Sequence, residues 1–186
     1  MVKIKIYKSI FIIFLCLWGN SCNINKTPIN NSLQPLYPVS IKIPQDIEDW
    51  LIKEDFRYEI DKNKQDEWKP IEQTIKDKTF DCEDLAILSC SILEELGYKD
   101  TMLIAIYGKQ LAHGICWFRE PDGTWSFFST STDLINKPKY YLASKVKNPF
   151  NILYEYFPEW TKINLCTPKG YSIYQVNRQD LERMQL

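Results

Sequence analysis

The stretch from Glu83 to Leu96 carries the strongest structural signal in the chain, because its apolar residues recur at the spacing of one helix face. The residues that define this face are Leu85, Leu88, Ile92 and Leu96. Asp81 precedes the stretch as a predicted N-cap, and Gly97 follows as a predicted stop. The sequence therefore predicts an amphipathic helix that needs an apolar surface to pack on, with Cys82 in or just before its first turn.

That surface is predicted directly after the helix. Three β-type runs at residues 102–107, 112–118 and 125–130 are separated by turn residues, which is typical of an antiparallel meander. Shorter elements are predicted around this core: helices at 47–51, 71–75 and 149–157, and a strand pair at 162–166 and 171–176. A central helix followed by an antiparallel sheet defines an α+β fold class.

The first 22 residues have the layout of a secretory signal. Three lysines lead into an apolar run at 10–18 that is too short to cross a bilayer, and small or polar residues then precede Cys22. The pattern resembles a bacterial lipoprotein signal, whose cysteine is lipidated after cleavage. We therefore expect an exported protein anchored to a bacterial cell membrane, inner or outer, through Cys22. An ordinary cleaved signal with a chance cysteine is the alternative.

The rest of the chain divides into a linker and one domain. Residues 23–45 are rich in Asn, Pro and Ser and predict an extended linker, and residues 46–186 are long and apolar enough for one substantial core. The 23 Lys and Arg residues nearly balance the 24 Asp and Glu residues, so the charge gives no sign of a nucleic-acid partner. We expect a monomer with no nucleic-acid partner.

Four cysteines lie in the predicted domain: Cys82, Cys90, Cys116 and Cys166. Four cysteines allow three sets of pairings, and an exported chain can form disulfides, so the pairing stays open. The chain has no Cys-x-x-Cys motif and a single histidine, which argues against a zinc site.

Cys82 and His113 are the candidate catalytic pair. A helix N-terminus and a neighbouring imidazolium both favour the thiolate form of a cysteine, which is the nucleophilic form. His113 is the one histidine of the chain and lies in the second predicted strand. Because strand residues alternate, His113 and Trp117 share one face, and Cys116 points away from whatever His113 faces.

Two segments in this order resemble a known family. They are "DEWKPIEQTIKDKTFDCEDLAILSCSILEELGY" and "AHGICWFREPDGTWSFFST". They look like the transglutaminase-like superfamily of papain-type enzymes, especially the bacterial transglutaminase-like cysteine peptidases, over roughly residues 50 to 132. The resemblance implies a papain-like core, Cys82 as the nucleophile, and His113 as the general base and acid. It also implies a peptide or protein substrate.

The sequence departs from the family pattern at two positions. Four residues after Trp125, where the family has Asp or Asn, stands Ser129. We take Ser129 as the third catalytic residue, although a hydroxyl cannot stabilise an imidazolium by charge, and the downstream Asp133 is the alternative. Phe80 stands where the family usually has glycine, and it either narrows the substrate cleft or packs in the core.

The function that follows is acyl transfer by an exported cysteine peptidase or amidase, with hydrolysis of peptide or amide bonds. A non-catalytic binding or assembly lipoprotein on the same scaffold is the main alternative. A protein-crosslinking transglutaminase is the third possibility.

No cofactor is expected. Asp81, Glu83 and Asp84 flank the nucleophile, and some members of the resembled branch bind calcium through acids in this motif. Helix capping and complementation of the helix dipole explain the three acids without an ion, so calcium is the less favoured interpretation.

Overall fold

The computed structural model describes residues 36–60, 68–109, 112–130, 139–167 and 171–185. The chain divides into two compact units, one made of residues 1–34 and 179–186 and the other of residues 35–178. In the first unit the described residues belong to helix α6 (Arg178–Gln185), in which Arg183 forms an ion pair with Asp180 at 3.6 Å. The candidate site lies in the second unit.

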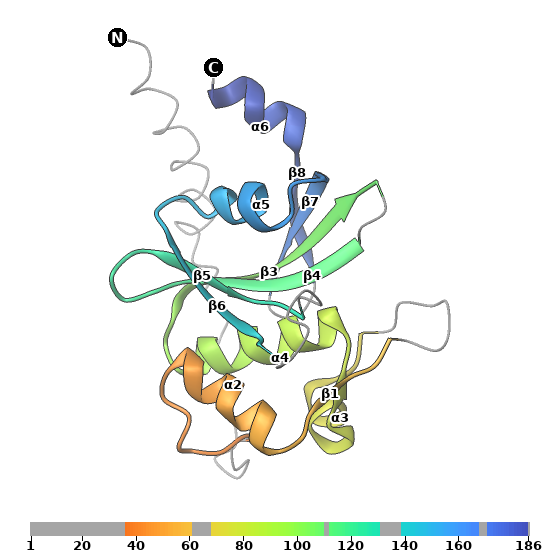
Figure 1. Cartoon of the computed structure of the whole chain (residues 1–186), viewed down its shortest axis with the longest axis vertical. Coiled ribbons are helices and arrows are strands. Elements are labelled where there is room, and N and C mark those ends of the chain that lie inside the picture. Colours follow the sequence, from red (N-terminus) through yellow and green to blue (C-terminus); the bar gives the residue numbers. More distant parts are fainter. Residues whose placement is uncertain (1–35, 61–67, 110–111, 131–138, 168–170, 186) are drawn as a thin grey trace, which may run out of the picture. The chain divides into compact units, whose positions relative to one another are not determined.

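A six-stranded antiparallel sheet forms the frame of residues 35–178 (Figure 1). Its strands run in the spatial order β6-β5-β4-β3-β7-β8. Their bounds are β3 (Lys99–Gly108), β4 (Ala112–Arg119), β5 (Trp125–Phe128), β6 (Tyr141–Val146), β7 (Trp160–Cys166) and β8 (Ser172–Asn177). Helix α4 (Cys82–Glu95) packs on one face of this sheet, against β3, β4 and β5, and helix α5 (Phe150–Tyr156) lies on the other face.

Smaller elements surround α4 on its side of the sheet. They are helices α2 (Pro44–Lys53) and α3 (Ile71–Asp77) and a parallel pair of short strands, β1 (Arg57–Tyr58) and β2 (Thr79–Phe80). Strand β2 leads into α4 through Asp81 alone, so its pairing with β1 fixes where the helix begins. None of the described helices is long and apolar enough to cross a membrane.

The predicted α+β fold is confirmed. The helix begins at Cys82, Asp81 accepts a hydrogen bond from the backbone N–H of Asp84 at 3.1 Å, and Gly97 follows the helix at φ +84°. The predicted meander corresponds to β3, β4 and β5, which pair in sequence order. Helix α6 and strands β1, β2 and β6 were not predicted.

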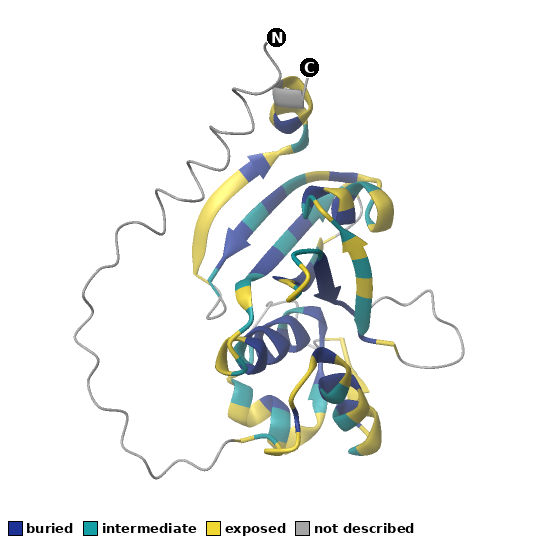
Figure 2. Ribbon diagram, turned by 90° about the vertical axis from the view of Figure 1, so that its left-hand side faces the viewer, coloured by how far each residue is buried: buried dark blue, intermediate teal, exposed yellow. Residues whose placement is uncertain are grey.

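Alternation along β4 divides the core into two layers. Cys116 and Phe118 belong to the cluster under α4, whereas the Trp117 ring lies 5.8 Å from the ring of Phe150 on the opposite face. Figure 2 shows α4 as almost continuously buried. The expectation that Cys116 and His113 belong to opposite faces is confirmed, because the His113 ring lies 5.5 Å from Phe157, which directly follows α5.

The folded part reaches further towards the N-terminus than the predicted linker boundary at Gln45. Ile41 is 2% exposed and belongs to the core under α4, and Pro44 begins α2. Proline suits this first helical position because its missing N–H has no partner there. The predicted signal and most of the linker, including Cys22, lie outside the described residues.

Candidate active site

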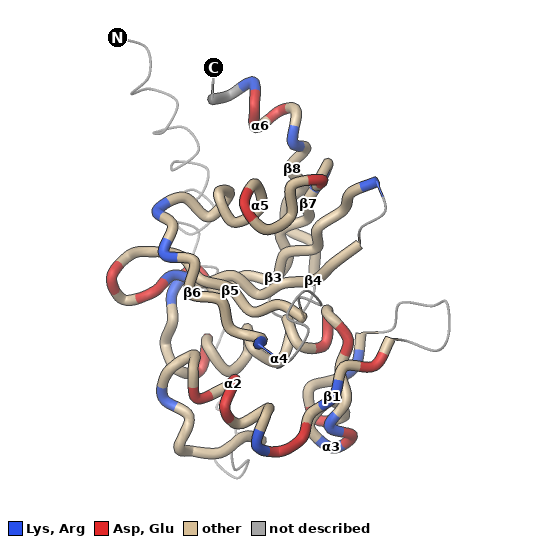
Figure 3. Tube along the Cα trace, in the orientation of Figure 1, with Lys and Arg blue, Asp and Glu red and all other residues tan. Residues whose placement is uncertain are grey.

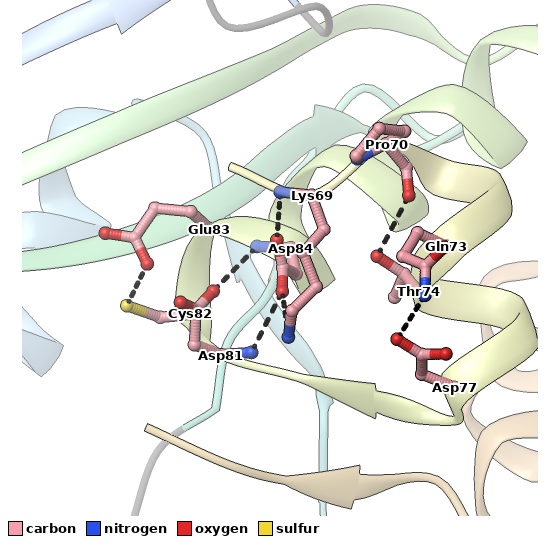
Figure 4. A network of polar contacts seen from close by, with 9 residues as sticks. All are labelled: Lys69, Pro70, Gln73, Thr74, Asp77, Asp81, Cys82, Glu83 and Asp84. Carbon is pink, nitrogen blue, oxygen red and sulfur yellow. Dashed lines mark hydrogen bonds and ion pairs between the residues drawn. The ribbon is translucent and has the colours of Figure 1, made fainter. Parts of the chain in front are cut away.

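Cys82 is held at the start of α4 by two reciprocal caps (Figure 4). The Asp81 carboxylate accepts from the backbone N–H of Asp84, and the Asp84 carboxylate lies 3.5 Å from the backbone N–H of Asp81. The caps satisfy backbone donors that a helix start leaves free. They place the Cys82 side chain in the first turn, where the helix dipole favours negative charge.

Gly114 allows the start of α4 to lie directly on strand β4. A Cβ atom built on Gly114 would lie 3.1 Å from Cα and 3.2 Å from N of Glu83, and 3.3 Å from the carbonyl carbon of Cys82. All three atoms belong to the backbone, which cannot turn aside as a side chain can. Through this close approach the Gly114 backbone N–H acts on the Cys82 thiol and favours its ionised form, which lowers the pKa of the thiol.

His113 contacts Ser129, the third predicted catalytic residue. Its Nε2 lies 2.8 Å from Oγ of Ser129, which is 1% exposed and follows strand β5. The imidazole packs against the ring of Phe157. The structure therefore brings His113 and Ser129 together, as the family resemblance implied, whereas the alternative, Asp133, lies outside the described residues.

Gly114, on which the backbone of Cys82 and Glu83 lies, directly follows His113, but no hydrogen bond joins the Cys82 and His113 side chains in the part of the chain that the structure describes. The His113 ring packs on Phe157, on the side of the sheet that carries α5, whereas Cys82 begins α4 on the other side. The thiol instead donates to Oε2 of Glu83 at 2.9 Å. Nε2 of His113 is engaged by Ser129, which leaves Nδ1 as the ring atom able to receive a proton from the cysteine.

Burial and Glu83 both favour the neutral forms of this pair. Burial, followed by the hydrogen bond and the charge of Glu83, raises the pKa of the Cys82 thiol, while the Gly114 N–H opposes the rise. Burial lowers the pKa of His113, and the nearby Glu83 charge opposes that shift. A protonated thiol is a poor nucleophile, so proton transfer has to precede any attack.

Glu83 is the residue of this site that the sequence interpretation missed. It was assigned to helix capping, whereas its carboxylate contacts the thiol and also influences His113. The available signal was its position directly after the cysteine, where a flexible acid can reach either the solvent or the sulfur. Figure 3 shows the acidic positions gathered at this end of α4.

A buried ion pair fastens α4 to the segment that precedes α3. The Asp84 side chain is fully buried, lies 3.1 Å from Nζ of Lys69, and accepts the backbone N–H of Lys69 at 2.9 Å. A buried carboxylate needs such partners, since an unpaired charge in the interior is costly. Lys69 thereby links the segment before α3 to the helix that carries Cys82 (Figure 4).

Phe80, the second departure from the family pattern, packs in the core. It is fully buried, with its ring 6.3 Å from that of Phe56 and 5.3 Å from that of Tyr140. Of the two roles considered for Phe80, the structure supports packing. The aromatic side chain anchors β2 beneath the start of α4.

A cavity of about 270 Å³ opens at the opposite end of β4 and β5, with Glu120, Ser126 and Tyr141 in its wall. It includes neither Cys82 nor His113. The cavity is therefore separate from the candidate active site.

Comparisons with known proteins give a likeness in structure alone. No family model and no curated protein matches the chain. Eight chains of solved structures match, among them two of Legionella pneumophila LapG. The calcium-bound form is 19% identical, with 79% of this chain and 78% of that chain covered and a TM-score of 0.45. The EGTA-treated form is 20% identical, with coverage of 79% and 80% and a TM-score of 0.44.

The expectation that no cofactor takes part is contradicted by this comparison and is withdrawn, because one of the similar structures is calcium-bound. We tested whether the three acids beside Cys82 fit such an ion. Asp84 is paired with Lys69, Glu83 with the thiol, and Asp81 with the Asp84 backbone. Within the described ranges no three Asp, Glu, His or Cys side chains are grouped to hold a metal ion. In this arrangement the three acids do not fit, and we derive no chemical step through calcium.

Proposed function

We propose that the chain is a transglutaminase-like cysteine hydrolase that cleaves peptide or amide bonds in a peptide or protein substrate. Cys82 is the nucleophile, His113 the general base and acid, and Ser129 the residue that orients the imidazole. The observation that carries the proposal is the 2.8 Å contact between His113 Nε2 and Ser129 Oγ, made by the residue that precedes Gly114, on which the helix start with Cys82 lies.

The reaction follows from these positions. Ser129 Oγ accepts from Nε2–H of His113, so Nδ1 is free to take the proton of the Cys82 thiol. The thiolate then attacks the carbonyl carbon, and backbone N–H groups at the start of α4 stabilise the oxyanion. His113 returns the proton to the leaving amine and next activates the water that releases the acyl group.

The second candidate is a binding or assembly protein without catalysis. It is favoured by the hydrogen bond between Cys82 and Glu83, which holds the proton on the sulfur and away from His113. Ser129, which stands where the family has an acid, also supports this second candidate, because loss of the orienting acid in a related triad costs about 10⁴-fold in rate. For hydrolysis, Glu83 has to release the thiol when substrate binds.

The alkylation rate of Cys82 tests the proposal. With iodoacetamide near pH 8, we expect Cys82 to react faster than Cys166, which is 2% exposed. His113→Ala lowers the Cys82 rate because the proton acceptor is lost. Glu83→Gln raises the rate, since removing the charge lowers the pKa of Cys82, and each unit gives about tenfold more thiolate.

Peptide mapping by mass spectrometry supplies the rate at each cysteine. Glu72→Gln, which removes an exposed acid from the first turn of α3, is the matched control and leaves the rate unchanged. Equal rates at Cys82 and Cys166, or a Cys82 rate indifferent to His113→Ala, would overturn the proposed pair.

We further propose that the protein is exported as a monomer and anchored to a bacterial membrane through lipid on Cys22. The basic and apolar N-terminal segment and the position of Cys22 support this proposal. In a bacterial host fed radiolabelled palmitate, the wild-type chain takes up label and fractionates with membranes. Cys22→Ala removes both properties, and a Cys22→Ala chain that keeps its label would refute the anchor.

A further inference from the structure

Two buried cysteines that the proposed chemistry does not use face each other across the main helix–sheet contact. Cys90 lies on α4 and Cys116 on β4, and both are 0% exposed. Both belong to one core cluster, and burial together with the neighbouring Cys116 thiol raises the pKa of Cys90. The two sulfur atoms are thus already neighbours in the folded chain.

The register of helix and strand accounts for this contact. The backbone of Glu83 lies on Gly114, which fixes one point where α4 crosses β4. Cys90 follows Glu83 by seven residues, close to two helical turns, and so returns to the same helix face. Cys116 follows Gly114 by two residues and therefore points to the same sheet face. The next contact along the two elements is that of Cys90 with Cys116.

The other pairings conflict with the same geometry. Cys82 and Cys90 are separated by eight helical residues, or about 12 Å, and disulfides join Cα atoms within about 7 Å. Cys116 and Cys166 both lie opposite Leu103 on its two sides, so two strand spacings, about 9.6 Å, separate them. The remaining alternative, Cys82 with Cys116 and Cys90 with Cys166, conflicts with the register that places Cys90 over Cys116 in the core.

We propose that Cys90 and Cys116 form a disulfide when the chain folds in the presence of a small-molecule disulfide such as oxidised glutathione. The two thiols lose two protons and two electrons, and a sulfur–sulfur bond forms between Cys90 Sγ and Cys116 Sγ. The glutathione disulfide takes up both electrons and both protons, and its own sulfur–sulfur bond breaks to give two thiols.

The bond would join the helix that carries Cys82 to the strand that carries His113. It leaves Cys82 as a free thiol, because its sulfur is engaged by Glu83 and the Gly114 backbone rather than by another cysteine. Closing the loop between Cys90 and Cys116 restricts the unfolded chain, and we expect the midpoint of thermal unfolding to rise by about 5–10 °C.

The test refolds the reduced, unfolded full-length chain with and without oxidised glutathione, blocks free thiols with iodoacetamide, and maps the peptides by mass spectrometry. We expect a peptide pair joined through Cys90 and Cys116 and the higher midpoint. Cys90→Ala and Cys116→Ala each remove both results, whereas Cys166→Ala, the matched change at another buried cysteine, keeps them.

The wild-type peptide map decides the proposal even if a variant does not fold. Alkylation of both Cys90 and Cys116 after oxidative refolding would overturn it, and so would a bond from either to a different cysteine. The map records no enzymatic activity, so its outcome is independent of whether the chain is a hydrolase.

Discussion

Replacing Cys82 with alanine lowers kcat/KM for hydrolysis of a peptide substrate by about 10⁴-fold or more. The thiol is the only group at the start of α4 placed to attack a carbonyl among the described residues, with the Gly114 N–H on one side and the His113 strand beneath it. Without the sulfur no acyl intermediate can form. Measurement of kcat and KM on a fluorogenic peptide library checks the expectation.

A double variant of Cys82 and His113 tests whether the two residues act together. Residues that act as one unit are not additive, so Cys82→Ala combined with His113→Ala is no slower than Cys82→Ala alone. Cys166→Ala removes a thiol from strand β7 that faces the core, and it leaves kcat/KM within a few-fold of the wild-type value. This control separates loss of the nucleophile from loss of any cysteine.

Two other outcomes would redirect the functional conclusion. If the wild-type and Cys82→Ala proteins bind a partner equally well and neither hydrolyses a peptide, the binding or assembly function replaces the hydrolase. If the wild-type protein incorporates an amine into a glutamine-containing acceptor and Cys82→Ala does not, the acyl group passes to amines and the chain is a crosslinking enzyme.

The part of the fold that the sequence predicted is the part fixed by local pattern. Helix α4 was predictable because its apolar spacing, its Asp81 cap and Gly97 all agree within one short segment. The meander was predictable for a similar reason, since β3, β4 and β5 follow one another and pair with their sequence neighbours.

The missed elements depend on contacts between distant segments. Strands β1 and β2 have two residues each, and their parallel pairing joins segments on either side of α3. Strand β6 pairs with β5 across a register shift and has no fully buried residue. Its sequence, Tyr-Leu-Ala-Ser-Lys-Val, does not alternate between apolar and polar residues, which is the local signal of a strand. The return of β7 to the far side of β3 likewise leaves no local signal.

At the candidate site, positions were predictable and contacts were not. The family resemblance singled out Ser129, four residues after Trp125, as the partner of His113, and the structure brings the two side chains to 2.8 Å. The contact of Glu83 with the thiol depends on a rotamer within the first turn, which spacing does not encode. The need for glycine at position 114 was not predictable either, because it comes from the close approach of the start of α4 to strand β4.

Gly114→Val has the largest expected effect on stability. A valine side chain meets backbone atoms of Cys82 and Glu83 that already lie 3.1–3.3 Å from the ideal Cβ position, so α4 has to move off the sheet. Overpacking of this kind costs up to about 3 kcal/mol of unfolding free energy. Urea denaturation followed by circular dichroism measures the loss.

The matched control is Ala112→Val, which adds a β-branched side chain at an exposed position of the same strand. Surface changes of this kind usually alter the free energy of unfolding by less than about 0.5 kcal/mol. Equal stability of Gly114→Val and Ala112→Val would show that the start of α4 is not held against β4 as described.

Gly114→Ala separates stability from chemistry at the same position. A single Cβ requires the backbone of α4 to shift by a few tenths of an ångström, so the expected loss of unfolding free energy is near 1 kcal/mol. The same shift moves Cys82 relative to His113, and misplacement of reacting groups by about 1 Å can cost about 100-fold in rate. We therefore expect Gly114→Ala to stay folded while its kcat falls by roughly tenfold or more. A fall in kcat without a matching fall in stability would indicate that the close approach of α4 to Gly114 positions the nucleophile as well as packing the core.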